Sequence, residues 1–451
     1  MSQPPQPDAA GVPADPAGAS VSTRPGGDAE VVPAVDRPEV AMGAAELVVD
    51  SFGEYAHAWF RRVRSGDSGA LPVVAGLIVI VIIFQVQQSE FLSVGNIVNL
   101  VIQGAVFMLL GMAEMFALLL GEIDLSVGYQ AGLGAAVCAV LLTPQFGWPW
   151  WGAILGALAG TTLFGALQGT IVTRLGLPSF VVTLAGLLGG EGLLIQVIGS
   201  ARYSTGGTIR ITNNIVNDVV NGNISPVAGW IMLAVLVILF ALFTLRRDTR
   251  RRASGLAAPP LGLTVLRISL VAAAGVVLLL VCNANRGNLV VLRGVPFVVP
   301  ILLAVLVGWT FLLNRMRFGR YVYAIGGNPE AARRAGVRLA RIRTACFALA
   351  GLTAGVAGIV YESRLGSISN NIDGGTYVLY AVAAAVIGGT SLFGGRGKPL
   401  HAVLGGIVIA AIYNGLGLLG VGAAVQYMVT ALVLLAAVTM DRLTRRNATT
   451  R

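Results

Sequence analysis

The sequence predicts an all-α polytopic membrane protein with about 10–12 transmembrane helices. Hydrophobic residues make up 55% of the 451 residues and charged residues only 12%, compared with about 25% charged residues in an average soluble protein. The apolar residues come in blocks of about twenty, the length of helix that crosses the hydrocarbon core of a bilayer. Glycine is abundant, at 59 residues, and small residues allow helices to pack closely in lipid. These observations exclude a soluble globular, collagen-like or coiled-coil chain.

Residues 1–60 differ in composition from the rest of the chain. They contain nine acidic residues and two arginines, and Pro, Ala, Gly and Asp dominate the first fifty positions. Such a segment has too little apolar surface to offset the entropy lost on folding. It also lacks the basic start followed by an apolar stretch that marks a secretory signal. We expect residues 1–60 to form a disordered, acidic cytoplasmic tail.

Twelve apolar blocks follow the tail and define a predicted transmembrane domain over residues 70–441. The third and the tenth blocks are short, and either could be a half-span instead of a full crossing. Residues 442–451 are then a short cytoplasmic C-terminal tail. The blocks lie at 71–88, 97–119, 127–143, 150–172, 178–199, 227–245, 261–282, 295–313, 344–361, 377–393, 399–419 and 425–440.

Basic residues predict which loops face the cytoplasm, because positively charged loops are retained on that side. If the residues before the first block lie inside, every second loop should be basic, and this alternation holds along the chain. Both termini are therefore expected in the cytoplasm. The basic segments are Arg61–Arg64, Arg174, Arg246–Arg252, Arg315–Arg343, Arg396–Lys398 and Arg442–Arg446. The loops expected to face the exterior include 88–96, 202–225, 283–293 and 364–376.

The chain contains a weak internal sequence repeat. Ile123-Asp124 opens the third block and Ile372-Asp373 opens the tenth, and small residues and an Ala-rich helix follow each pair. The expected orientation puts the first pair on the cytoplasmic side and the second on the exterior side. That is the arrangement of an inverted repeat, in which short or broken helices face a central pathway. Chance similarity between two Gly- and Ala-rich helix starts is the alternative.

Polar residues at these two helix starts are the candidates for a translocation path or gate. They are Glu122, Asp124 and Ser126 before the third block, and Asp373 and Thr376 at the tenth. An acidic residue near membrane depth is unfavourable and is therefore a candidate for a functional role. Asp124 has a second interpretation as the N-cap of the helix that follows it, and the two roles are compatible.

The basic loop at 315–343 contains signals for a short helix. Asn328 suits a helix N-cap and Pro329 the first helical turn. Glu330 complements the positive end of the helix dipole, and Gly336 ends a piece of about seven residues. A helix this short cannot fold alone and should dock on another surface, whereas an ordinary basic loop would explain the arginines but not the caps. The candidate docking residues are Gly326, Gly327, Asn328, Pro329, Glu330, Ala331, Ala332, Arg333 and Gly336.

The sequence contains no pattern typical of a catalytic or metal site. The three cysteines are widely spaced in or beside apolar blocks, and His57 and His401 have no partner at ligand spacing. The phosphate-binding loop of nucleotide-binding proteins is also missing from the sequence. We therefore expect no catalytic residues, no metal and no cofactor.

Four motifs occur along the predicted transmembrane domain. They are Gly121–Gly128 with its Ile-Asp-Leu-Ser-Val-Gly sequence, Leu177–Leu184, Tyr323–Ala332 and Ala384–Gly397. Together they resemble the membrane subunit of bacterial ATP-binding-cassette (ABC) importers for monosaccharides, the ribose/xylose/galactose type, over about residues 70–441. The Arg246–Arg252 loop and the additional block at 261–282 are more similar to the xylose-type permeases than to the shorter ribose-type permeases.

The resemblance implies a function and a set of partners. Such a permease would form the membrane pathway for a monosaccharide, with a pentose such as xylose as first candidate, in the bacterial plasma (inner) membrane. A separate ABC ATPase subunit would bind ATP and dock at the 315–343 loop. An extracytoplasmic sugar-binding protein would deliver the sugar, and a second permease copy would complete a homodimer. Apart from the lipid bilayer no further partner is implied, and nucleic acid is not expected.

Other functions are weighed as alternatives. A branched-chain amino-acid ABC permease has a similar build. An ion-coupled secondary transporter would need acids or histidines within the membrane as a relay, and Glu114 and Glu191 are the candidates. A polytopic membrane enzyme would need a cluster of catalytic residues, which the sequence does not contain.

Overall fold

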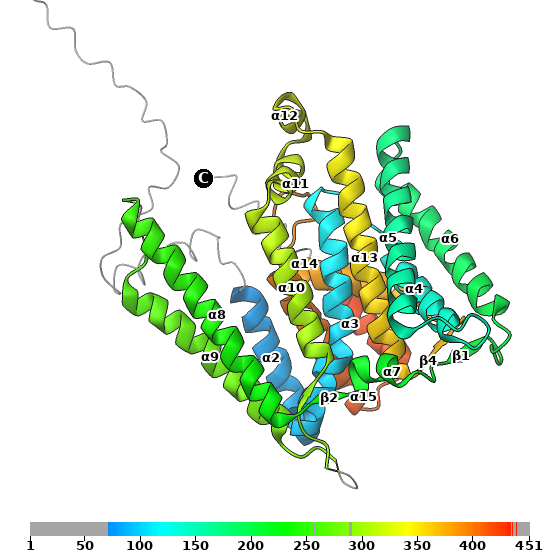
Figure 1. Ribbon diagram of the computed structural model, residues 1–451, viewed down its shortest axis with the longest axis horizontal. Coiled ribbons are helices and arrows are strands. Elements are labelled where there is room, and N and C mark those ends of the chain that lie inside the picture. The colour runs from blue at the N-terminus through cyan, green and yellow to red at the C-terminus, as the bar shows by residue number, and fades with distance from the viewer. Residues whose placement is uncertain (1–70, 256–257, 288–290, 434, 436–438, 440–451) are drawn as a thin grey trace, which may run out of the picture. The chain divides into compact units, whose positions relative to one another are not determined.

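The computed structural model describes residues 71–255, 258–287 and 291–433, together with 435 and 439. The expected tails at 1–60 and 442–451 lie outside these described residues. Helices dominate the described part of the chain (Figure 1). In chain order, the elements are α2 (Leu71–Gln87), the 3₁₀ helix η1 (Ser89–Leu92), α3 (Val94–Leu119), α4 (Val127–Leu142), α5 (Trp150–Leu175), α6 (Ser179–Ser200), β1 (Thr208–Arg210), α7 (Asn214–Asn221), β2 (Asn223–Ile224), α8 (Pro226–Ala253), α9 (Leu261–Asn283), β3 (Val295–Pro296), α10 (Val298–Arg315), α11 (Arg317–Gly327), α12 (Pro329–Arg334), α13 (Leu339–Leu365), β4 (Ser367–Ser369), α14 (Gly374–Ile387) and α15 (Pro399–Leu418).

Each of the twelve apolar blocks contains a helix, so the expected fold class is confirmed. Within the described residues, eight helices are long and apolar enough to cross a membrane. The third and tenth blocks form α4 and α14, which have only 16 and 14 residues, too few for a full crossing of about twenty. The helix at Ala423–Val433 occupies the last block.

Helices α3 and α13 form the centre of the bundle and pack against each other. In their most apolar stretches, 78% of the α3 residues and 61% of the α13 residues are buried. Helix α13 also packs on α4 and α5, and α3 packs in the same way on α14 and α15. We call α3, α4 and α5 the first set and α13, α14 and α15 the second set. The short helix of each set therefore lies against the central helix of the other set, as expected for a repeat whose two halves are intertwined.

The loops separate into two groups at opposite ends of the bundle (Figure 1). At one end, the Gly395 amide donates to the Leu119 carbonyl at 2.9 Å, and the Tyr323 hydroxyl donates to the Gly397 carbonyl at 2.8 Å. At the other end, β1 pairs antiparallel with β4, and β2 with β3. The loop before α4 belongs to the first end, and β4, which precedes α14, belongs to the second. The two sets are thus inverted relative to each other, in agreement with the expected inverted repeat.

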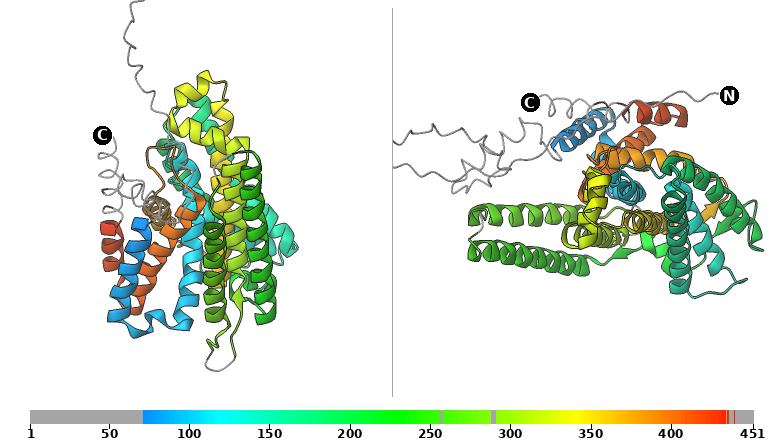
Figure 2. Two further views of the ribbon diagram at one scale, coloured as in Figure 1. Left: turned by 90° about the vertical axis from the view of Figure 1, so that its left-hand side faces the viewer. Right: turned by 90° about the horizontal axis from the view of Figure 1, so that it is seen from above.

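Helices α8 and α9 form a hairpin at the edge of the bundle (Figure 2). Only 11% of the most apolar stretch of each helix is buried, so these helices present a largely exposed apolar surface suited to lipid. Near the basic end of the hairpin, the Thr264 hydroxyl donates to the buried Asp248 carboxylate at 2.7 Å. This bond joins the two helices at the position where the sequence places the arginines of the Arg246–Arg252 segment.

Candidate translocation site and coupling segment

The expected short helix is present as α12, between α11 and α13. The Asn328 side chain caps it by accepting a hydrogen bond from the Ala331 amide at 2.9 Å. The Glu330 carboxylate accepts from Arg333 at 2.9 Å and from Arg334 at 3.1 Å. These two arginines hold the pKa of Glu330 below its usual value. Glu330 and both arginines are exposed, so α12 presents a charged surface outward.

Helix α11 fixes the position of α12 against the bundle. A Cβ atom at Gly326 would lie 1.9 Å from the Leu119 carbonyl oxygen and 2.4 Å from the Gly395 amide nitrogen. Only a glycine allows the backbones to come this close. The candidate docking residues therefore divide into a packed part, which includes Gly326 and the buried Ala332, and an exposed part around Glu330. The close contact at Gly326 thus joins α11, the helix before α12, to the end of α3.

A second connection joins the start of α13 to the loop before α4. Arg343 Nε lies 2.8 Å from Glu122 Oε1. Burial raises the pKa of the Glu122 carboxyl above its usual value, and the neighbouring Arg343 guanidinium lowers it in part. Glu122, expected at a path or gate, is thus an ion-pair partner of the helix that follows α12.

Asp124 and Ser126 belong to a buried polar network. Asp124 Oδ1 accepts a hydrogen bond from the Ser126 amide at 2.9 Å, and the Ser126 hydroxyl lies within hydrogen-bond distance of the same carboxylate. Gln130 donates to the Ser126 hydroxyl oxygen at 2.6 Å, and Glu114 accepts from the Asp124 amide at 3.2 Å. The N-cap interpretation of Asp124 is wrong in detail. Helix α4 begins at Val127, and Asp124 holds the turn before it through Ser126.

Asp373 and Thr376 lie at the start of α14. Asp373 is the N-cap of this helix and accepts hydrogen bonds from the Thr376 amide at 3.0 Å and from the Thr376 hydroxyl. The Tyr427 hydroxyl also donates to it, at 3.3 Å. Burial alone would raise the pKa of Asp373, but these hydrogen bonds outweigh it and hold the pKa below its usual range. Unlike Asp124, Asp373 is exposed.

The two groups of candidate gate residues flank the crossing of α4 and α14 without forming one cluster. A Cβ atom at Gly128, in the first turn of α4, would lie 2.0 Å from the Gly374 carbonyl oxygen at the start of α14. The N-terminal ends of both short helices therefore touch inside the bundle. The two similar Ile-Asp pairs, Ile123-Asp124 and Ile372-Asp373, thus precede the two short helices whose N-terminal ends meet.

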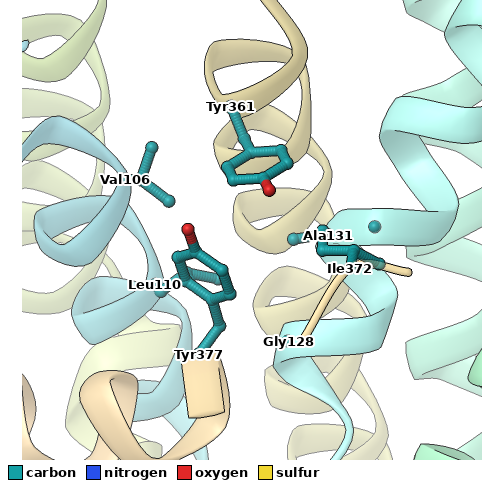
Figure 3. Close-up of a pocket in the computed structure, with 8 residues that line it drawn as sticks. Val106, Leu110, Gly128, Ala131, Tyr361, Ile372 and Tyr377 are labelled. Carbon is teal, nitrogen blue, oxygen red and sulfur yellow. The ribbon is translucent and has the colours of Figure 1, made fainter. Parts of the chain in front are cut away.

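A small pocket lies beside this crossing (Figure 3), with room for roughly one water molecule. Tyr361 of α13 and Tyr377 of α14 line one part of it, and Val106 and Leu110 of α3 line another. These two tyrosines are not among the candidate site residues predicted from the sequence. The available signal was the number of tyrosines in the last hundred residues, five of the ten in the chain.

The cysteines and the possible metal-ligand side chains are spread through the described part of the chain. Cys138, Cys282 and Cys346 are free and buried, as expected for packing residues. In the part of the chain that the structure describes, no three or more His, Cys, Asp or Glu side chains gather closely enough to hold a metal ion.

Comparisons with known proteins place this arrangement in a family. The family model described as the branched-chain amino acid transport system / permease component matches residues 96–438. The xylose transport system permease protein of Escherichia coli (strain K12) is 36% identical over 393 residues, which are 86% of this chain and 95% of the relative.

Two further relatives are similar along most of their length. The xylose transport system permease protein of Haemophilus influenzae is 32% identical over 84% of this chain and 98% of its own. The ribose import permease protein of Escherichia coli (strain K12) is 27% identical over 86% of this chain and 95% of its own. No solved structure matches the chain. Because the family model matches more than half of the chain and a 36% identical relative is covered almost completely, this multi-pass membrane protein belongs to the family of transport-system permease components.

Proposed function

We propose that this protein is the permease subunit of an ABC importer and forms the membrane pathway for a monosaccharide, with xylose as first candidate. The observation that carries the proposal is the 36% identity to a xylose permease over 95% of that protein. The family description also names branched-chain amino acids, so an amino-acid permease is the second candidate. The curated relatives named for xylose, allose and ribose favour a sugar.

In this proposal, ATP is bound and hydrolysed by a separate ATPase subunit, and the permease has no cofactor of its own. The exposed, charged surface of α12 docks on the ATPase. Motion of α12 reaches α3 through the close contact at Gly326, and it reaches the loop before α4 through the ion pair of Arg343 with Glu122. An extracytoplasmic sugar-binding protein delivers the sugar at the end that carries β1 to β4. A second copy of the permease completes the pathway.

The expected orientation places the protein in the bacterial inner membrane with both termini and α12 in the cytoplasm. Single cysteines at Thr205, Ser254 and Ala335, on a background in which the three native cysteines are replaced by alanine, test this orientation. A membrane-impermeant maleimide should label Thr205→Cys in intact cells. Ser254→Cys and Ala335→Cys should react only after the membrane is opened, because they lie in predicted cytoplasmic loops. Labelling of Ala335→Cys in intact cells would contradict the orientation.

Reconstitution tests the transported substrate. The permease is placed in proteoliposomes with its ATPase and binding protein, and uptake of radiolabelled xylose, ribose and leucine is measured with and without ATP. ATP-dependent uptake of a pentose is expected, and exclusive uptake of leucine would support the amino-acid permease instead. Uptake driven by an ion gradient without ATP would favour a secondary transporter. The permease alone should show no tight sugar binding by calorimetry, because the pocket at the crossing of α4 and α14 has room for only roughly one water molecule.

A further inference from the structure

A group of tyrosine rings lies beside the crossing of α4 and α14. Tyr361 and Tyr377 pack edge to face with ring centroids 5.3 Å apart. The ring centroids of Tyr377 and Tyr380 lie 6.2 Å apart, and those of Tyr380 and Tyr413 lie 6.3 Å apart. The rings come from α13, α14 and α15, so three helices contribute to one aromatic group. Only Tyr361 and Tyr377 of these four line the pocket.

The hydroxyl groups of Tyr361 and Tyr377 point into the space between the helices, with Val106 and Leu110 on the side of α3 (Figure 3). Both tyrosines are partly exposed, whereas Tyr380 is buried. The pocket thus combines apolar walls with two hydroxyl groups that come from different helices. This composition is typical of small-molecule sites.

The chemistry of the lining favours a neutral polyol. An aromatic ring offers an apolar face to the C–H surface of a sugar ring, and a phenolic hydroxyl can donate to and accept from sugar hydroxyls. None of the residues that line the pocket is charged. A zwitterionic amino acid would leave its ammonium and carboxylate groups without partners there, which is strongly unfavourable in a site that excludes water.

The pocket is closed in this structure, because it has room for only roughly one water molecule. A sugar ring can enter only if Tyr361 and Tyr377 move apart. These residues lie on α13 and α14, and four residues separate the end of α12 from the start of α13. The helix proposed to dock on the ATPase is therefore joined through a short turn to the helix that carries Tyr361.

We propose that Tyr361 and Tyr377 form a sugar-contact site at the crossing of the two short helices, which selects monosaccharides by hydrogen bonds to their hydroxyl groups and opens when α13 and α14 separate. This inference rests on the proposed transport of a monosaccharide. It assigns the contact with the sugar to two residues of the permease itself, in addition to any selection by a binding protein.

The test removes single hydroxyl groups and keeps the rings. Tyr361→Phe and Tyr377→Phe are reconstituted with the ATPase and with saturating sugar-loaded binding protein, and the uptake of xylose and ribose is compared with the wild type. Loss of one neutral hydrogen bond should lower the uptake of the favoured sugar by about three- to tenfold and alter the ratio between the sugars. ATP hydrolysis stimulated by the loaded binding protein should stay unchanged, because docking on the ATPase is intact. Tyr413→Phe is the matched control, in the same aromatic group but outside the pocket.

The outcomes separate this inference from the proposed function. Wild-type uptake of a monosaccharide with unchanged rates and ratios in both pocket variants would overturn the contact site and leave the transport function standing. An equal loss in Tyr413→Phe would also overturn it, since a general effect of the aromatic group would then explain the result. A wild-type importer that carries no monosaccharide would overturn both.

Discussion

Replacing Glu330 by arginine is expected to lower sugar uptake by at least about tenfold, the effect of losing a central residue of a docking surface. The carboxylate is exposed and binds Arg333 and Arg334 on its own helix. Reversal of its charge breaks these contacts and places a cation at the positive end of the helix dipole. The fold should tolerate this change, because the packed contacts of the segment lie at Gly326 and Ala332. Stimulation of ATP hydrolysis by loaded binding protein should be lost together with uptake.

The measurement is ATP-dependent uptake in proteoliposomes at equal amounts of reconstituted permease. Glu90→Arg is the matched control, because Glu90 is also an exposed acid in the first turn of a short helix, in η1, and η1 lies between α2 and α3 at the end expected outside. This control should transport normally. Near-normal uptake by Glu330→Arg would contradict the docking role of α12.

Replacing Gly128 by valine is expected to prevent the correct crossing of α4 and α14. A Cβ atom at this position would lie 2.0 Å from the Gly374 carbonyl oxygen, so backbone would have to move. Overpacking of this kind costs about 3 kcal/mol or more when the neighbouring atoms cannot yield. The variant should show a thermal unfolding midpoint several degrees below that of the wild type in detergent, and little uptake.

Gly160→Val is the matched control. Gly160 is exposed on α5, and nothing lies within 4 Å of the position of an added Cβ atom. Its unfolding midpoint should remain near that of the wild type, since surface substitutions change stability by about 0.5 kcal/mol or less. Equal midpoints for the two valine variants would contradict the tight crossing at Gly128.

The glycine pairs at a spacing of four residues illustrate a limit of the sequence. Gly156 with Gly160 and Gly165 with Gly169 follow the same pattern on the same helix. In the structure, a Cβ atom at Gly165 would lie 2.2 Å from the Phe347 carbonyl oxygen of α13, whereas Gly160 has no neighbour within 4 Å. Spacing places both members of a pair on one helix face. It does not say whether that face meets another helix.

The positions of the spans and of α12 could be predicted because their causes are local. An apolar block of about twenty residues forms a helix in lipid whatever lies beside it. Asn328 caps α12 through the amide of Ala331, three residues away. The short lengths of α4 and α14 and their Ile-Asp starts were also visible in the sequence. The coupling role of α12 and the gate role of Asp124 and Asp373 stay predictions.

What the sequence by itself determined is therefore the class of protein, the order of its apolar helices and their approximate positions along the chain. Tertiary structure decided which of those residues meet. The pocket combines Val106 with Tyr361 and Tyr377, and the ion pair joins Glu122 to Arg343, across more than two hundred residues of chain. Lipid does not drive helices together through the hydrophobic effect, so their contacts depend on the fit of small residues and polar groups. That fit is a property of pairs of helix surfaces, and no single segment of the sequence contains it.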